Sequence, residues 1–176
     1  MGQASGEDFG VEGLMGFLEG ALLDYELTDA ELTALRRLVR GASSRDVASS
    51  AILSDLAEVL GVSQSGDESV LTEGSENREG IVALLQAVVE THSQDLKAAP
   101  EHIQQRLLGV LGGLLADDRF TLQEAVDLED FLEEFGDNRD EWPVSTVGSL
   151  LEGISSEKFS ERAATSALRT LMRELR

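Results

Sequence analysis

The sequence predicts an all-α protein, and three observations support this fold class. Apolar residues recur at spacings of three and four along almost the whole chain, and alternating β-branched runs are missing. Proline occurs only at positions 100 and 143. The chain has 176 residues, of which 41% are hydrophobic, and this is enough to bury a core. We therefore expect a bundle of about seven to eight helices.

The first expected helix spans about residues 9 to 23 and is unusually rich in glycine. Gly13, Gly16 and Gly20 lie at spacings of three and four, so they form a smooth strip along one side of the helix. Each glycine costs the helix roughly 1 kcal/mol relative to alanine. The strip predicts a place where another helix can approach closely. The expected buried residues are Leu14, Phe17, Leu18, Ala21 and Leu22.

The next two expected helices have recognisable ends. The second begins at Thr28, whose side chain can cap the helix while Glu31 reaches back, as in a capping box. The third spans about residues 45 to 60 and is stopped by Gly61. Their expected buried residues are Leu32, Leu35, Leu38 and Val39 in the second helix and Ile52, Leu53, Leu56, Val59 and Leu60 in the third.

Residues 62–77 interrupt the helical pattern, because they are rich in serine, glycine and acid and have no apolar stripe. We interpret them as a polar linker or long loop between an N-terminal helical half, residues 1–61, and a C-terminal half, residues 78–176. A single compact domain is the alternative. A helix over 78–94 is expected to follow the linker, with Ile81, Leu84, Leu85, Val88 and Val89 buried.

Four further helices are expected in the rest of the chain. One opens at Pro100, a residue suited to a first helical turn, and runs to about residue 116. Thr121 and Glu124 form a second capping box at the start of a helix that ends near residue 135. Two shorter helices, at about 144–153 and 156–175, complete the chain.

An internal repeat relates two of these regions. Residues 16–35 align with residues 109–128 without a gap at an offset of 93, and eight of twenty positions are identical. Both segments read as a helix, an acidic turn and a capped helix. The alignment predicts a duplicated helical hairpin. The identical pairs are Gly16/Gly109, Leu18/Leu111, Gly20/Gly113, Leu22/Leu115, Asp24/Asp117, Thr28/Thr121, Glu31/Glu124 and Leu35/Leu128.

The repeated pattern resembles the TerB-like family, which is named after tellurite-resistance proteins. The stretch LLADDRFTLQEAVDLEDFLEEF at 114–135 carries the resemblance best, and residues 22–39 form a weaker second copy. The resemblance implies a compact helical bundle, acidic residues near the helix-joining turn that have been linked to metal binding, and a role in membrane-associated stress or signalling assemblies. The family usually has glycine after the turn aspartate, whereas Tyr25 and Asp118 stand there in this chain. Expectations about metal therefore transfer less well than the fold.

The acidic turns themselves offer only weak divalent-cation ligands, namely Asp24, Glu26, Asp117 and Asp118. An EF-hand loop needs a bidentate glutamate at its twelfth position. Leucine stands there in both copies, so a tight calcium site is not expected. Weak divalent-cation binding remains open, beside the interpretation that these are solvated acids favourable to helix N-termini.

Catalytic motifs are missing from the sequence, and we expect a protein that is not an enzyme and has no cofactor. Cysteine is absent, which excludes thiol chemistry and thiolate metal sites. The two histidines, His92 and His102, occur without a metalloprotease, nucleophile-elbow or phosphate-loop pattern. Trp142 and Tyr25 are expected to be core or loop anchors.

The charge of the chain is its most informative property. The net charge is -20, which excludes a conventional nucleic-acid binder. Nine acids fall within residues 124–141 against the single Arg139. We expect a basic protein to bind this acidic helix, and the candidate contact residues are Glu124, Asp127, Glu129, Asp130, Glu133, Glu134 and Asp137. Acid at a helix C-terminus is disfavoured by the dipole, so a cation should compensate. Candidates within the chain are Arg36, Arg37, Arg40, Arg162, Arg169, Arg173 and Arg176.

The function expected from the sequence is that of a non-enzymatic adaptor that presents an acidic face to a basic protein partner. Two alternatives remain open. The acids could mimic nucleic-acid phosphates and inhibit a DNA-binding protein, or the turn acids could make the protein a divalent-metal-responsive TerB-like stress protein. The N-terminus carries no targeting pattern and no apolar run approaches about 18 residues, so we expect a cytoplasmic protein without membrane insertion.

Overall fold

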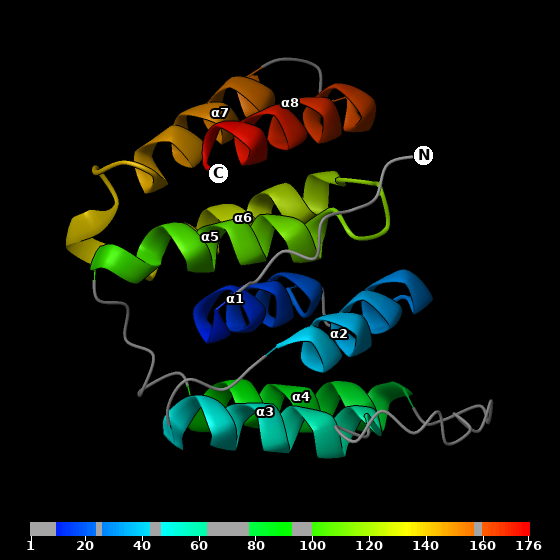
Figure 1. The fold of residues 1–176 in the computed structure, drawn as a ribbon. Helices are drawn as coiled ribbons and strands as arrows, with labels where there is room; N and C mark the ends of the chain where they lie inside the picture. The colour runs from blue at the N-terminus through cyan, green and yellow to red at the C-terminus, as the bar shows by residue number, and fades with distance from the viewer. Residues whose placement is uncertain (1–9, 24–25, 43–46, 63–77, 93–99, 157–159) are drawn as a thin grey trace.

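A computed structural model describes residues 10–23, 26–42, 47–62, 78–92, 100–156 and 160–176, and the described residues form helices joined by turns, with no strand among them (Figure 1). The all-α prediction is therefore confirmed. The helices are α1 (Val11–Ala21), α2 (Asp29–Gly41), α3 (Val47–Leu60), α4 (Arg78–His92), α5 (Pro100–Leu114), α6 (Leu122–Glu133), the 3₁₀ helix η1 (Gly136–Asn138), α7 (Val144–Ser156) and α8 (Glu161–Glu174).

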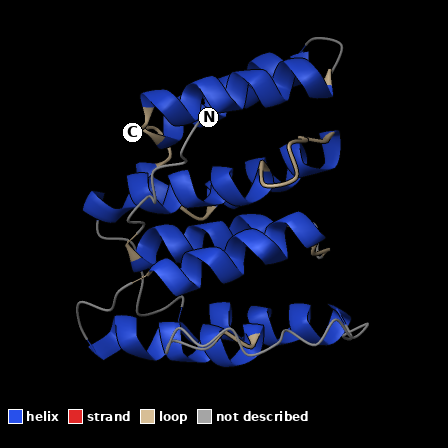
Figure 2. Ribbon diagram, turned by 45° about the vertical axis from the view of Figure 1, so that its right-hand side comes forward, coloured by secondary structure: helices blue, strands red, loops and turns tan. Residues whose placement is uncertain are grey.

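The α-helices are stacked in four layers of two. Figures 1 and 2 show the layers in the order α3 with α4, α1 with α2, α5 with α6, and α7 with α8. The two middle layers meet mainly through α1 and α5, which form the most extensive helix pair of the described chain. The two middle layers, α1 with α2 and α5 with α6, are therefore the segments that the sequence repeat relates.

The core is divided into two hydrophobic clusters that correspond to two four-helix units. One cluster extends from Val11 to Val88 and is built by α1 to α4, and the other extends from Ile103 to Leu175 and is built by α5 to α8. We call these units the N-terminal and C-terminal repeats. Helix α4 packs on α3 and contributes Val82, Leu85 and Val88 to the N-terminal cluster, whereas the sequence suggested residues 78–176 as a C-terminal half. The expected linker, 62–77, lies outside the described residues except for Val62, which is buried.

Both capping boxes form as expected, and they define the same corner in each repeat. The Thr28 backbone N–H donates to Glu31 Oε2 at 2.7 Å, and the Glu31 N–H donates to Thr28 Oγ1 at 3.2 Å. At the start of α6 the corresponding distances, between Thr121 and Glu124, are 2.6 and 3.2 Å. Both glutamates are buried, and the residues before the two caps are buried leucine and phenylalanine. The duplicated hairpin is therefore present in three dimensions.

The expected buried stripes are largely correct, with one clear exception. Leu18 and Leu111, at equivalent positions of the repeat, are both 0% exposed. Gly61 ends α3 with a φ of 64°, a conformation that glycine adopts without strain. In α4, however, Leu84 is 55% exposed and Val82 is buried instead. Helix α4 thus buries Val82 in place of Leu84, whereas Leu85 and Val88 are buried as expected.

The two repeats meet through glycine. We call Gly13, Gly16 and Gly20 of α1 together with Gly109 and Gly113 of α5 the glycine seam. On α1, a Cβ atom added to Gly16 would lie 2.0 Å from the Arg106 carbonyl oxygen, and one added to Gly20 would lie 2.2 Å from the Val110 oxygen. On α5, a Cβ atom added to Gly109 would lie 2.1 Å from the Gly13 oxygen, and one added to Gly113 would lie 2.4 Å from the Phe17 oxygen. No side chain fits at these distances, so the helix backbones touch, as the glycine strip predicted.

The seam contacts are reciprocal. The offset of 93 residues converts Gly16 facing Arg106 into Gly109 facing Gly13, and it converts Gly20 facing Val110 into Gly113 facing Phe17. Such self-complementary exchange of contacts is the property of a two-fold interface. The repeats are therefore related as the subunits of a symmetric dimer would be, within one chain.

Candidate functional site

Helix α6 carries most of the predicted acidic residues, and three of them, Glu129, Asp130 and Glu133, are exposed on the side away from the core. Its inner side consists of buried Ala125, Leu128, Phe131 and Leu132, which pack in the C-terminal cluster. The residues that point away share spacings of three or four and all are exposed. We call this set the α6 face. It consists of Leu122, Val126, Glu129, Asp130 and Glu133.

The α6 face is not purely acidic. Leu122 is 54% exposed and Val126 is 47% exposed, so the first turns of the face are apolar. Glu129 and Asp130 follow on the same side and are exposed. Within the described part of the chain, neither carboxylate makes a hydrogen bond or an ion pair. The face therefore combines an apolar end with an acidic end.

The other predicted contact residues have different environments. Glu124 is buried in the capping box and does not lie on the α6 face. Asp127 is half-buried and accepts a hydrogen bond from Gln123 Nε2 at 2.9 Å. Glu134 is the C-cap residue of α6, and Asp137 is exposed in η1. The structure therefore brings Glu129, Asp130 and Glu133 together on one outward side.

Two arginines compensate the acidic end of α6, and neither was among the expected cations. Arg139 Nη1 lies 3.2 Å from Glu133 Oε1, and Arg106 Nη2 lies 3.5 Å from Glu134 Oε2. Of the expected arginines, Arg169 pairs with Asp118, and Arg36 donates to the Leu60 carbonyl oxygen. The two arginines that pair with Glu133 and Glu134 are therefore not among those that the sequence suggested.

Arg106 is the centre of a half-buried polar cluster beside the glycine seam. Its Nε and Nη2 atoms donate to the two carboxylate oxygens of Glu19 at 2.8 and 2.6 Å. Its guanidinium carbon lies 5.2 Å from the ring centroid of Phe131 and 5.5 Å from that of Phe135. These distances allow cation–π attraction. The cluster ties α1, α5 and α6 together.

Burial changes the acidity of this ion pair. Loss of water contact raises the pKa of Glu19 above its ordinary value of 4.5, because the hydrogen bonds and attraction from Arg106 offset the burial only in part. Burial alone would lower the pKa of Arg106, but Glu19 and Glu134 outweigh it and raise that pKa. Nothing in the sequence predicted this pair, because its members are 87 residues apart and follow no motif.

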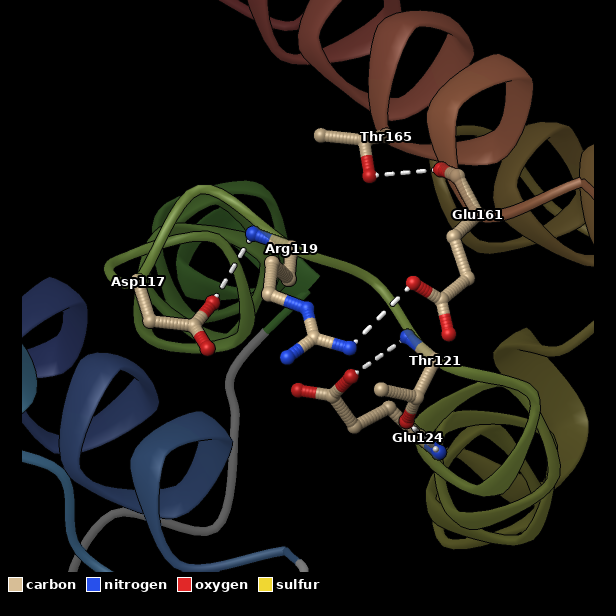
Figure 3. A network of polar contacts seen from close by, with 6 residues as sticks. All are labelled: Asp117, Arg119, Thr121, Glu124, Glu161 and Thr165. Atoms are coloured by element: carbon tan, nitrogen blue, oxygen red, sulfur yellow. Dashed lines mark hydrogen bonds and ion pairs between the residues drawn. The ribbon is translucent and has the colours of Figure 1, made fainter.

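The acidic turn between α5 and α6 is held by its own hydrogen bonds and by α8. Asp117 Oδ1 accepts from the Arg119 N–H at 2.9 Å, and Arg119 Nη2 lies 3.3 Å from Glu161 Oε2 (Figure 3). Asp118 has a φ of 68° and pairs with Arg169. The described residues contain no group of three or more carboxylates and imidazoles that could hold a metal ion. Of the other weak candidates, Asp24 lies outside the described residues and Glu26 is exposed.

The histidines and the tryptophan complete the predicted residues. His92 is buried, and its Nε2 lies 2.8 Å from Asp55 Oδ2 on α3. His102 Nδ1 lies 3.0 Å from Glu12 Oε1 on α1. Each histidine therefore links two helices. Trp142 is 59% exposed, so it is not a core residue. Tyr25 lies outside the described residues.

Comparisons with known proteins return no relative. No protein-family model, no curated protein and no solved structure matches the chain. Among the helices of the described residues, none is long and apolar enough to cross a membrane.

Proposed function

We propose that this chain is a non-enzymatic interaction or adaptor protein of the cytoplasm that binds a basic protein partner through the α6 face. The observation that carries the proposal is the exposure of Glu129 and Asp130, which make no hydrogen bond or ion pair within the described residues. Carboxylates near a helix C-terminus oppose the dipole and repel one another, so they do not stabilise the free protein. Attraction to a basic surface gives them a role.

The repeat supports this proposal. At the positions of Glu129, Asp130 and Glu133, helix α2 has Arg36, Arg37 and Arg40. The two helices have the same capping box, and the buried Glu31, Leu35 and Val39 of α2 correspond to buried residues of α6, so the fold does not require acid at these positions. The acidic end of the α6 face is therefore available for a purpose other than folding.

The experiment removes the charge without changing the shape. The variant combines Glu129→Gln, Asp130→Asn, Glu133→Gln and Glu134→Gln. Its two ion pairs are largely exposed on the acidic side, so their loss should change stability little. We expect an unchanged or slightly higher melting temperature, a basic partner recovered from host extract by the wild-type protein but not by the variant, and a flatter salt dependence when that purified partner is titrated.

A matched control separates this site from general acidity. Substituting Glu58, Glu79, Glu152 and Glu174 with glutamine removes the same charge from exposed positions on α3, α4, α7 and α8. This control should bind the partner nearly as tightly as the wild type. Equal loss in both variants, or unfolding of the α6 variant, would contradict the proposal.

The nucleic-acid mimic remains an alternative within the same site. In that case the captured partner would be a DNA-binding protein, and DNA would displace this chain from it. An adaptor bound to another basic surface would not be displaced. We retain the TerB-like relationship as a proposal about the fold, supported by the two capped hairpins. For the metal-responsive alternative, both Asp117 and Asp118 already have partners, which weakens it.

A further inference from the structure

The apolar end of the α6 face carries information beyond the charge. Within the described residues, four large apolar side chains are exposed, namely Leu84, Leu122, Val126 and Trp142. Leu122 and Val126 are one helical turn apart on the same side of α6. Together with Glu129, Asp130 and Glu133 they make a continuous stripe about 18 Å long, as the helical rise of about 1.5 Å per residue requires.

The fold does not need apolar residues at these two positions. The repeat aligns Leu122 with Asp29 and Val126 with Thr33, and α2 presents those polar residues outward in the same hairpin. Exposed leucine and valine weaken neither the capping box nor the core, but they leave apolar surface in water. A partner that covers them would remove that surface.

We infer that the α6 face docks an amphipathic basic helix of a protein partner, with apolar side chains of that helix on Leu122 and Val126 and its lysines or arginines beside Glu129, Asp130 and Glu133. This inference rests on the proposed function and names the partner's chemistry. Helices dock on helices by apolar anchors at spacings of three and four, and three turns match the length of the stripe. Phosphate-bearing partners, including nucleic acids and anionic lipid surfaces, would be repelled by the carboxylates.

The test uses two synthetic helical peptides of equal charge and the intact protein. Peptide A has leucines at spacings of three and four on one side and lysines on the other, and peptide B has serine in place of every leucine. Binding is followed by fluorescence anisotropy at low and high salt. We expect peptide A to bind more tightly than peptide B, and we expect the double variant Leu122→Ser/Val126→Ser to weaken peptide A roughly tenfold while changing peptide B little.

Leu84→Ser is the matched control, because Leu84 on α4 is 55% exposed and Leu122 is 54% exposed. It should leave the affinity for peptide A unchanged. Melting curves of both variants verify that each remains folded. If the double variant binds peptide A as tightly as the wild type, the inference is wrong.

The outcomes also separate this inference from the proposed function. The α6 charge variant could lose binding while the apolar substitutions have no effect. In that case the α6 face would bind by charge alone, and the inference of an amphipathic partner helix would be wrong. Equal binding by all variants would overturn both. Binding of peptide B as tight as that of peptide A would also exclude the apolar anchors and leave a surface that binds by charge alone.

Discussion

The capped hairpins of the N-terminal and C-terminal repeats share their caps and their buried leucines, but their second helices carry opposite charges on the outside. Leu35 and Leu128 are both fully buried, and the capping glutamates are buried in both. On the outside, the arginines of α2 are replaced by the acids of α6. The comparison teaches that the hairpin is specified by its caps, its buried leucines and its glycines, whereas its outward residues are free to serve different purposes.

The second difference lies at the seam itself. Gly13 of α1 has Arg106 as its equivalent in α5, and Glu19 has Gly112. The half-buried Glu19–Arg106 pair is therefore made across the seam by two positions whose counterparts carry no charge. This ion pair favours the packing of α1 on α5. If α1 packed on a second α1, or α5 on a second α5, each charge would lack its partner.

The largest expected effect concerns the equivalent leucines. Leu18→Ala and Leu111→Ala should each lower the free energy of unfolding by roughly 2–5 kcal/mol, because each removes a fully buried side chain and leaves a cavity. Urea denaturation of the two variants measures both values. Similar losses would support equivalent cores, and a neutral result at either position would contradict the duplicated hairpin.

Substitutions in the glycine seam should follow. Gly16→Ala and Gly109→Ala each force a Cβ against a carbonyl oxygen, and we expect a loss of roughly 1–3 kcal/mol in each, measured by urea denaturation. Gly112→Ala is the control on the same helix α5, since its Cβ would meet only side-chain atoms, the Phe17 ring at 3.4 Å and Met172 Cε at 3.8 Å. It should be neutral or slightly stabilising because alanine favours the helix. If Gly112→Ala lowered the unfolding free energy and Gly109→Ala did not, the backbone contact at the glycine seam would be contradicted.

The asymmetry of the seam should appear in the pH dependence of stability. Because burial raises the pKa of Glu19 above 4.5, the folded protein binds that proton more tightly than the unfolded chain does. The associated stability is fully present below pH 4.5 and is lost as the pH rises through the higher pKa of the folded state. With rising pH, the wild type should therefore lose unfolding free energy relative to the Glu19→Gln variant. A pH-independent difference would contradict this assignment.

The smallest expected effect is at the turn before α6. Asp118 has a φ of 68°, where glycine is favoured over other residues. Asp118→Gly should raise the unfolding free energy by less than about 1 kcal/mol, and Asp118→Ala should lower it, because alanine tolerates this backbone poorly. Asp118→Asn controls for the lost ion pair with Arg169, which is exposed. Thermal melts of the three variants would contradict the backbone argument if alanine were the most stable.

The elements that could be predicted from the sequence are those with local signals. Thr28 and Thr121 predict helix starts because each has a glutamate three positions later, which completes a capping box. The spacing of the glycines in α1 alone predicts that another helix approaches closely. In α4 the expectation is wrong for Leu84 alone, because Val82 and Leu84 are both apolar and only the packing against α3 decides which one is covered.

Long-range features of the candidate site escaped prediction for a similar reason. Arg106 has no distinctive neighbours in sequence, and its partners Glu19 and Glu134 come from other helices. The acids of α6 were visible as a pattern, but burial of Glu124 in its cap followed only from the hairpin geometry. The exposed Leu122 was not singled out, since a leucine at the first turn of a helix resembles any core residue until its neighbours are known.

The glycine seam has a consequence for valency. In a dimer of identical subunits every substitution appears twice, so an acidic apolar face on one subunit obliges the other to present the same face. Here both sides of the two-fold contact belong to one chain, and each can change alone. Each molecule has one α6 face, and the equivalent positions of α2 carry arginine in place of acid. The expected complex with a basic helix therefore contains a single partner for each copy of this chain, which titration to saturation would count directly.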